Sequence, residues 1–150
     1  FYISLSLACD QAGQFEKAEK AILEVLKRDP EHALALNNLA YMYMEHGVKF
    51  DEAIKMVRRA LAIEPDNGAY NDTLGWGYYK QGKYREARKH IENALRLADD
   101  NDKGVIYEHY GDILAKLGKG REAAEAYRNA MEFGEDKERI QPKIDALPVD

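Results

Sequence analysis

Cysteine, proline and long apolar runs are scarce in this chain, which excludes some classes of protein. Cys9 is the one cysteine, so no intramolecular disulfide can form, and we interpret this thiol as a buried, unreactive side chain. No run of about 18 apolar residues occurs, so we expect no membrane insertion by this segment. An initiator methionine and a signal-like segment are missing at Phe1, and we expect a piece of a longer protein whose export signal or lipid anchor, if any, lies upstream.

Positive charge is outnumbered, since 22 lysines and arginines face 27 aspartates and glutamates, giving a formal net charge of −5. An acidic chain lacks the electrostatic attraction to phosphate backbones, which argues against a nucleic-acid partner. The densest basic stretch, Lys80–Lys89, is interpreted as a solvated face. Apolar residues still make up 45% of the chain, enough for a buried core.

One pattern recurs four times: a glycine, an aromatic residue about two positions later, and an alanine about five positions later. The glycines are separated by 34, 35 and 36 residues, and in the fourth copy Gly120 stands in the aromatic place. Self-similarity at this period indicates a solenoid of stacked units rather than a single closed core. The glycines that define the repeat are Gly13, Gly47, Gly82 and Gly118.

Apolar spacing within each unit is helical. Leu36, Leu39 and Tyr43 fall at i, i+3 and i+7 and predict a helix before the glycine. Ala53 and Val57 begin a second stripe after it. Proline and cap-forming residues separate the units, and where the proline is missing, we read the acidic run 98–102 as a turn and helix cap. The sequence therefore predicts an all-α fold of helix–turn–helix units.

The unit resembles the tetratricopeptide repeat, a helix–turn–helix of 34 residues with the pattern W-x2-L-G-x2-Y, A-x3-F, A, P. The leucine column holds Leu5, Leu39, Leu74 and Tyr110; the small column holds Ser6, Ala40, Gly75 and Gly111; and the alanine column holds Ala18, Ala53, Ala87 and Ala123. The resemblance covers residues 1 to about 137 and implies a right-handed α-solenoid with units at about 1–32, 33–67, 68–103 and 104–137. Because two helices approach closely only at small residues, we expect a tight contact between Gly75 and Ala87.

Residues 138–150 are predicted to form a C-terminal capping helix and tail. Ile140, Ile144 and Leu147 would cover the apolar edge of the last unit. Pro142 is awkward inside such a helix, so we expect the helix to start late or to kink.

Catalytic and metal-binding patterns are missing from the sequence. None of the four histidines is paired at ligand spacing, and the run Asp99–Gly104 lacks the ligands of a calcium loop. His109 and Asp112 share a helix face with Glu108 alongside, which we interpret as a solvated polar patch. We therefore expect no enzyme activity, no cofactor and no metal site.

The resemblance implies that the first helix of each unit lines a concave groove through fixed positions. Carried over, these positions give the candidate partner-binding residues Asn37, Tyr41, Met44, Glu45, Asp72, Trp76, Tyr79, Lys80, Glu108, Asp112 and Lys116. The truncated first unit would add Ile3, Leu7, Asp10 and Gln11. The carboxylate clamp of chaperone-binding members needs lysine at the fifth position and asparagine at the ninth of one unit, and no unit here has that pair.

Tyr41, Trp76 and Tyr79 are large amphipathic residues that the repeat pattern does not require. All three are candidate binding anchors. The alternative for Trp76 and Tyr41 is packing between adjacent first helices, and the two roles are compatible. Asp72 and Glu108, with Asp112, would make the far part of the groove acidic. Our hypothesis is a non-catalytic scaffold whose groove binds a protein peptide or helix with apolar anchors and some basic character.

Two alternatives stay open. The array could self-associate into a homo-oligomer through the edge at Phe1, Tyr2 and Ile3 or through the groove. It could instead be the regulatory or substrate-docking arm of a larger enzyme or of an envelope lipoprotein assembly. The sequence resembles bacterial members of the family, many of which are exported or lipid-anchored, so localisation is open between the cytoplasm and a periplasmic or outer-membrane-anchored site.

Overall fold

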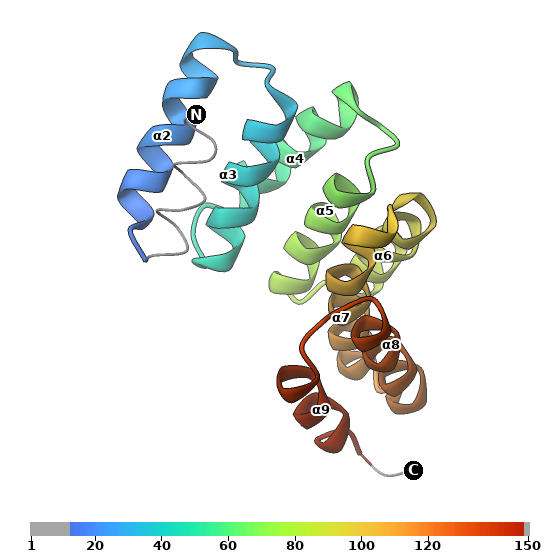
Figure 1. Ribbon diagram of the computed structural model, residues 1–150. Helices are drawn as coiled ribbons and strands as arrows, with labels where there is room; N and C mark the ends of the chain where they lie inside the picture. The colour runs from blue at the N-terminus through green and yellow to red at the C-terminus, as the bar shows by residue number, and fades with distance from the viewer. Residues whose placement is uncertain (1–12, 149–150) are drawn as a thin grey trace. The chain divides into compact units, whose positions relative to one another are not determined.

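The computed structural model describes residues 13–148, and within that range every regular element is an α-helix, as predicted (Figure 1). The chain divides into two compact units, Phe1–Pro65 and Asp66–Asp150. Cys9 lies outside the described residues, as do the first-repeat candidates Ile3, Leu7, Asp10 and Gln11.

The first unit contains α2 (Phe15–Arg28), α3 (Ala33–Glu45) and α4 (Phe50–Ile63). α3 packs against α4 and also against α2. The first helix of the pair, α3, is buried on most sides, whereas α2 and α4 each bury one stripe of alanine and branched aliphatic side chains.

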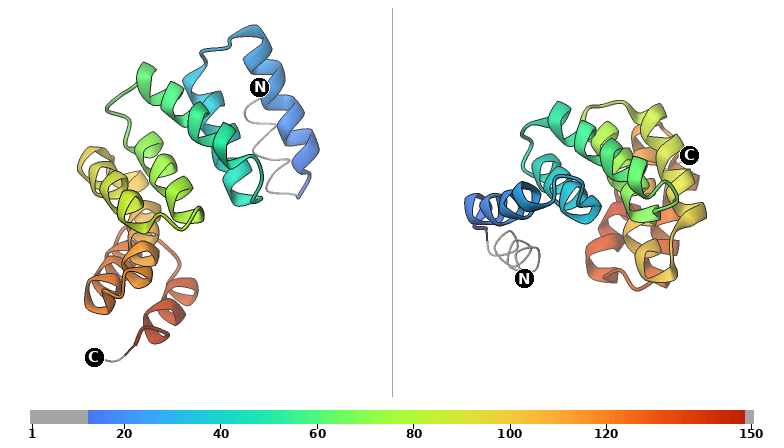
Figure 2. Two further views of the ribbon diagram at one scale, coloured as in Figure 1. Left: turned by 180° about the vertical axis from the view of Figure 1, so that it is seen from behind. Right: turned by 90° about the horizontal axis from the view of Figure 1, so that it is seen from above.

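The second unit contains α5 (Gly68–Lys80), α6 (Tyr84–Leu97), α7 (Asp100–Lys116), α8 (Gly120–Glu132) and α9 (Lys137–Asp145). α5 packs on α6 and α7 packs on α8, so that two helix hairpins follow one another, and α9 packs on α8 (Figure 2). α7 also contacts α5 and α6, which joins the two hairpins.

In the described hairpins, the repeating glycine follows the end of the first helix. Gly82 has φ = 76°, a left-handed conformation that glycine adopts without a steric penalty. Its N–H bonds to the Tyr79 carbonyl at 2.9 Å, and the Lys83 N–H bonds to the Tyr78 carbonyl at 2.9 Å, which is the Schellman arrangement. The same pair of bonds occurs around Gly118. The period seen in the sequence is therefore the period of this helix ending.

Small residues lie where the helices of a hairpin cross, which confirms the predicted contact. A Cβ added at Gly75 would lie 3.2 Å from the Ala87 carbonyl oxygen and 2.8 Å from Cγ1 of Ile91. The equivalent Gly111 faces the ring of Tyr127, where an added Cβ would be 2.5 Å from a ring carbon. Neither position has room for a larger residue.

Two helix starts differ from expectation. The acidic run 98–102, predicted as a turn and helix cap, is largely helical: α7 begins at Asp100, and Asp99 takes the cap position without a side-chain cap bond. Acidic residues stabilise a helix first turn through the helix dipole, so Asp100 and Asp102 favour an earlier start. α9 does not start late either, because Asp136 caps it by accepting the Glu138 N–H at 3.0 Å, and the helix continues through Pro142.

Candidate functional site

The candidate residues of the second unit lie on its first helices, α5 and α7, and differ in exposure. Asp72 and Trp76 are each 7% exposed, and Glu108 is 8% exposed. Tyr79 and Asp112 are half-buried, while Lys80 and Lys116 are exposed. Only part of the predicted set is therefore available to a partner.

Trp76 of α5 packs against α7. Its indole stacks on the imidazole of His109, with ring centroids 3.9 Å apart and planes at 17°. It also stacks with Tyr79, with ring centroids 4.6 Å apart and planes at 11°. Lys80 Nζ lies 5.1 Å from the centroid of the indole. Of the two roles considered for Trp76, packing between first helices is thus confirmed, and Tyr79 is the more accessible ring of the stack.

Asp72 forms a buried pair with His109, which is itself one ring of this stack. Oδ1 of Asp72 lies 2.8 Å from Nδ1 of His109. Burial alone would lower the pKa of His109, but the Asp72 carboxylate, helped by Asp112 and Glu108, outweighs it and raises the pKa above its usual value. The side chain of His109 is 8% exposed, so a ligand cannot reach it in this arrangement.

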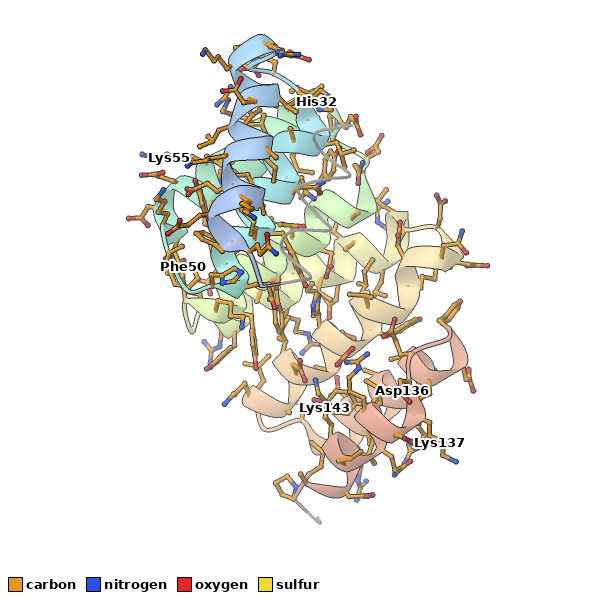
Figure 3. The ribbon with its side chains drawn as sticks, turned by 60° about the vertical axis from the view of Figure 1, so that its left-hand side comes forward. His32, Phe50, Lys55, Asp136, Lys137 and Lys143 are labelled. Carbon is orange, nitrogen blue, oxygen red and sulfur yellow. The ribbon has the colours of Figure 1, made fainter. Side chains whose placement is uncertain are left out.

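Basic side chains of α9 bind the acidic side chains of α7. Arg139 and Lys143 both donate to Glu108, the latter at 2.9 Å, and Lys143 also donates to Asp112 at 3.0 Å. Lys143 lies on the side of α9 that faces α7, and Lys137 lies on another side (Figure 3). The phenol of Tyr127 donates to Asp112 at 2.7 Å, which fixes that carboxylate from α8.

These contacts overturn two interpretations of the sequence. Glu108, His109 and Asp112 are not a solvated polar patch, because each is hydrogen-bonded to another helix. The far part of the groove is not an open acidic surface either, since Asp72 pairs with His109 and the other two carboxylates pair with α9. Burial would raise the pKa of Glu108, but its bonds to Arg139 and Lys143 hold that pKa below the usual value.

Sequence analysis assigned His109 to a solvated polar patch, whereas it pairs with Asp72, and it did not identify Arg139 and Lys143. A signal for the last two was present, because a predicted capping helix carried two cations four residues apart, beside Ile140 and Ile144.

Two of the four candidates on α3 are buried. Met44 is fully buried, and Asn37 is 7% exposed. Tyr41 is half-buried and Glu45 is exposed, so these two remain the accessible candidates on α3.

Neither a metal site nor a membrane span is found in the described part of the chain. Residues 13–148 contain no group of three or more histidine, cysteine or acidic side chains arranged to hold a metal ion. None of the helices in that range combines the length and the apolar character that crossing a bilayer requires.

Successive helix pairs, each with a left-handed glycine in its turn and small residues at its crossing, define a helical-hairpin repeat protein. Family models described as tetratricopeptide repeat match residues 6–69 and 69–101. The chain belongs to the tetratricopeptide-repeat family.

Similar curated proteins carry the same repeat. A repeat-containing protein of Pseudomonas aeruginosa, PA4667, is 29% identical over 107 residues, covering 71% of this chain and 18% of its own length. The repeat-containing protein MJ1428 of Methanocaldococcus jannaschii is 29% identical over 101 residues, covering 67% of this chain and 17% of its own. The chain thus spans less than a fifth of the length of these relatives.

Solved structures agree in fold. A structure of pilF from Pseudomonas aeruginosa superposes with a TM-score of 0.84 at 23% identity, covering 97% of this chain and 65% of that one. The complex of Cut9 with Hcn1 gives a TM-score of 0.88 at 16% identity, covering 97% of this chain and 29% of that one. At such identities the likeness establishes the tetratricopeptide solenoid fold alone.

Proposed function

We propose that this chain is a non-catalytic scaffold that binds a helix or extended peptide of a partner protein on the first-helix face of its second unit. The family membership supports a protein-interaction role in general. The location of the site is our inference from the side chains of α5 and α7.

The observation that carries the location is the aromatic stack of Tyr79, Trp76 and His109. Tyr79 is half-buried and held by Trp76, which is itself held by His109, so its ring is presented in a fixed orientation. A rigid aromatic side chain loses little conformational entropy on binding and offers a large contact area. Lys80 and Lys116, which are exposed, lie near the ends of the same two helices and would contact polar groups of the partner.

A non-catalytic role is supported by the state of the polar groups. His109, a candidate general base on this face, is buried and bound to Asp72. Glu108 and Asp112 are bound by the cations of α9. Side chains occupied in this way are not poised for proton transfer to a substrate.

Photo-crosslinking in the full-length protein tests the location. A photoreactive phenylalanine analogue at Lys80 or Lys116 should crosslink one partner in cells of the source organism. The same residue at Lys89 of α6 or Arg128 of α8, exposed positions on second helices, should not. The partner is then purified, and Tyr79→Ala should weaken its binding by about tenfold, the effect of losing one aromatic anchor.

Two results would contradict the proposal. Equal crosslinking from all four positions would remove the preference for first helices. Crosslinks exclusively to a second copy of the chain would favour the self-association alternative, in which case the oligomer, rather than a foreign helix, occupies the face.

A further inference from the structure

We propose that the surface of α7 and α8 now covered by α9 is a recognition site for a basic amphipathic helix, and that α9 is its intramolecular occupant. The inference deepens the proposed function, on which it rests, by naming the chemistry of a partner. It concerns the part of the same face that α9 covers, next to the Tyr79 stack, where Asp112 and Lys143 are close enough to act on Tyr79 electrostatically.

The site begins with an acidic pair one helical turn apart. Glu108 and Asp112 lie on the same face of α7, and Lys143 reaches both, at 2.9 and 3.0 Å. Arg139, one turn before Lys143, binds Glu108 as well. Two carboxylates four residues apart thus match two cations four residues apart on an opposing helix.

An apolar surface adjoins the acidic pair. Ile140 is completely buried, and Ile144 and Leu147 pack beside it. They contact a cluster on α7 and α8 made of Leu114, Ala123, Ala126 and Tyr127. The combined surface therefore selects cations at two positions four apart and aliphatic residues immediately after each of them.

α9 is a weak helix that depends on this docking. It has nine residues, and isolated helices shorter than about 12 residues are marginal in water. Pro142 lies within it and has no N–H to donate to the carbonyl four residues earlier. A longer helix with the same side-chain pattern and no proline would lose less conformational entropy than α9 does on binding the same surface.

Charge determines what can replace α9. Glu108 is 8% exposed, and a buried carboxylate without a partner is costly. The surface therefore cannot be filled by a purely apolar or an acidic helix. Any replacement must bring cations to Glu108 and Asp112, which commits the site to a basic partner helix.

A synthetic peptide provides the test. The probe is a fluorescent peptide with the sequence of residues 134–148 carrying Pro142→Ala, titrated by anisotropy into the full chain. Lys143→Gln in the protein weakens the internal helix, and Lys137→Gln removes a cation from the same helix on another side. The peptide should bind the Lys143→Gln protein about tenfold more tightly than it binds the wild type or the Lys137→Gln protein, because one charged hydrogen-bonding group has been lost in cis.

Two further measurements make the outcome decisive. A probe that also carries its own Lys143→Gln change should bind the Lys143→Gln protein about tenfold more weakly than the first probe. In the wild-type protein, excess probe should accelerate hydrogen exchange in α9 while α7 and α8 stay protected. This measurement does not depend on whether a variant folds.

Three results would overturn the inference. The probe could bind all three proteins with equal affinity, or the two probes could bind the Lys143→Gln protein with equal affinity. Hydrogen exchange in α9 could also stay unchanged at saturating probe. If crosslinks from Lys80 and Lys116 persist in that case, the proposed function stands without it. If the probe binds as expected but those crosslinks are missing, the location on the Tyr79 stack is the part that fails.

Discussion

Asp72 on α5 and His109 on α7 form a buried pair with 2.8 Å between Oδ1 and Nδ1, and this pair joins the first helices of two successive hairpins. Each residue is almost fully buried, and the indole of Trp76 covers the imidazole. Removing one partner of a buried pair leaves an uncompensated polar group, which is strongly destabilising. The pair therefore holds α5 and α7 in the register that presents Tyr79.

Stability should fall as pH rises through the neutral range. The pKa of His109 is raised above its usual 6.5 because the Asp72 carboxylate, with Asp112 and Glu108 adding, outweighs the effect of burial. A raised pKa means that the folded state binds the proton more tightly than the unfolded state. The stabilisation is fully present below the unfolded value and is lost as pH passes the folded value. Urea denaturation at a series of pH values measures it.

The matched variant is His109→Gln, which keeps a hydrogen-bonding side chain but cannot titrate. Its unfolding free energy should be lower than that of the wild type at acidic pH and should vary less from pH about 6 to about 9. If both proteins show the same pH profile in this range, the protonated pair does not stabilise the fold.

Trp76→Ala should destabilise the second unit rather than act on binding alone. Trp76 is 7% exposed and stacks on two rings, so its truncation should cost about 3–5 kcal/mol. Tyr79→Ala, at a half-buried ring, should cost less, about 1 kcal/mol. Thermal and urea unfolding compare the two variants, and equal losses would show that the stack is not organised around Trp76.

Gly111→Ala should be destabilising although alanine is the better helix former. The added methyl would lie 2.5 Å from the ring of Tyr127, whose phenol is held by Asp112, so the ring cannot move without losing that bond. We expect a loss of about 1–3 kcal/mol in unfolding free energy.

Gly120→Ala is the control for that variant. An added Cβ there would meet only the Pro148 carbonyl oxygen, at 3.6 Å. It should leave stability unchanged or raise it by less than about 1 kcal/mol. A stabilising effect at Gly111 comparable to that at Gly120 would contradict the packing at the helix crossing.

Acid should release α9 before the rest of the unit unfolds. Arg139 and Lys143 lower the pKa of Glu108 below its usual 4.5 against the opposing effect of burial. The stabilisation is present above the unfolded value and is lost as pH falls through the folded value. Hydrogen exchange of the α9 amides at progressively lower pH should show early loss of protection, and Glu108→Gln should show that loss already at neutral pH. Retained protection in Glu108→Gln would mean that the apolar contacts alone hold α9.

The helix hairpins were predictable because local chemistry sets them. A left-handed glycine ends the first helix, apolar residues at i, i+3 and i+7 give the helix its buried stripe, and Gly75 or Gly111 permits the close crossing. The helix ends were less predictable. At the start of α7, the favourable interaction of Asp100 with the helix dipole outweighs the turn-forming character of the acidic run. At the start of α9, the cap at Asp136 outweighs the effect of Pro142.

The sequence predicted which helices carry the candidate residues but not how those residues are buried or paired. The repeat register identified Asp72, Trp76 and Glu108 as residues of the first-helix face, yet it gave no information on how far each is buried. Asp72 and His109 are 37 residues apart, and Glu108 and Lys143 are 35 apart, each close to one repeat. The sequence by itself determined which helices become neighbours, because the spacing of glycines and small residues is a local property. Only the tertiary structure decided which carboxylate meets which cation, because that choice depends on helix crossing angles and side-chain rotamers.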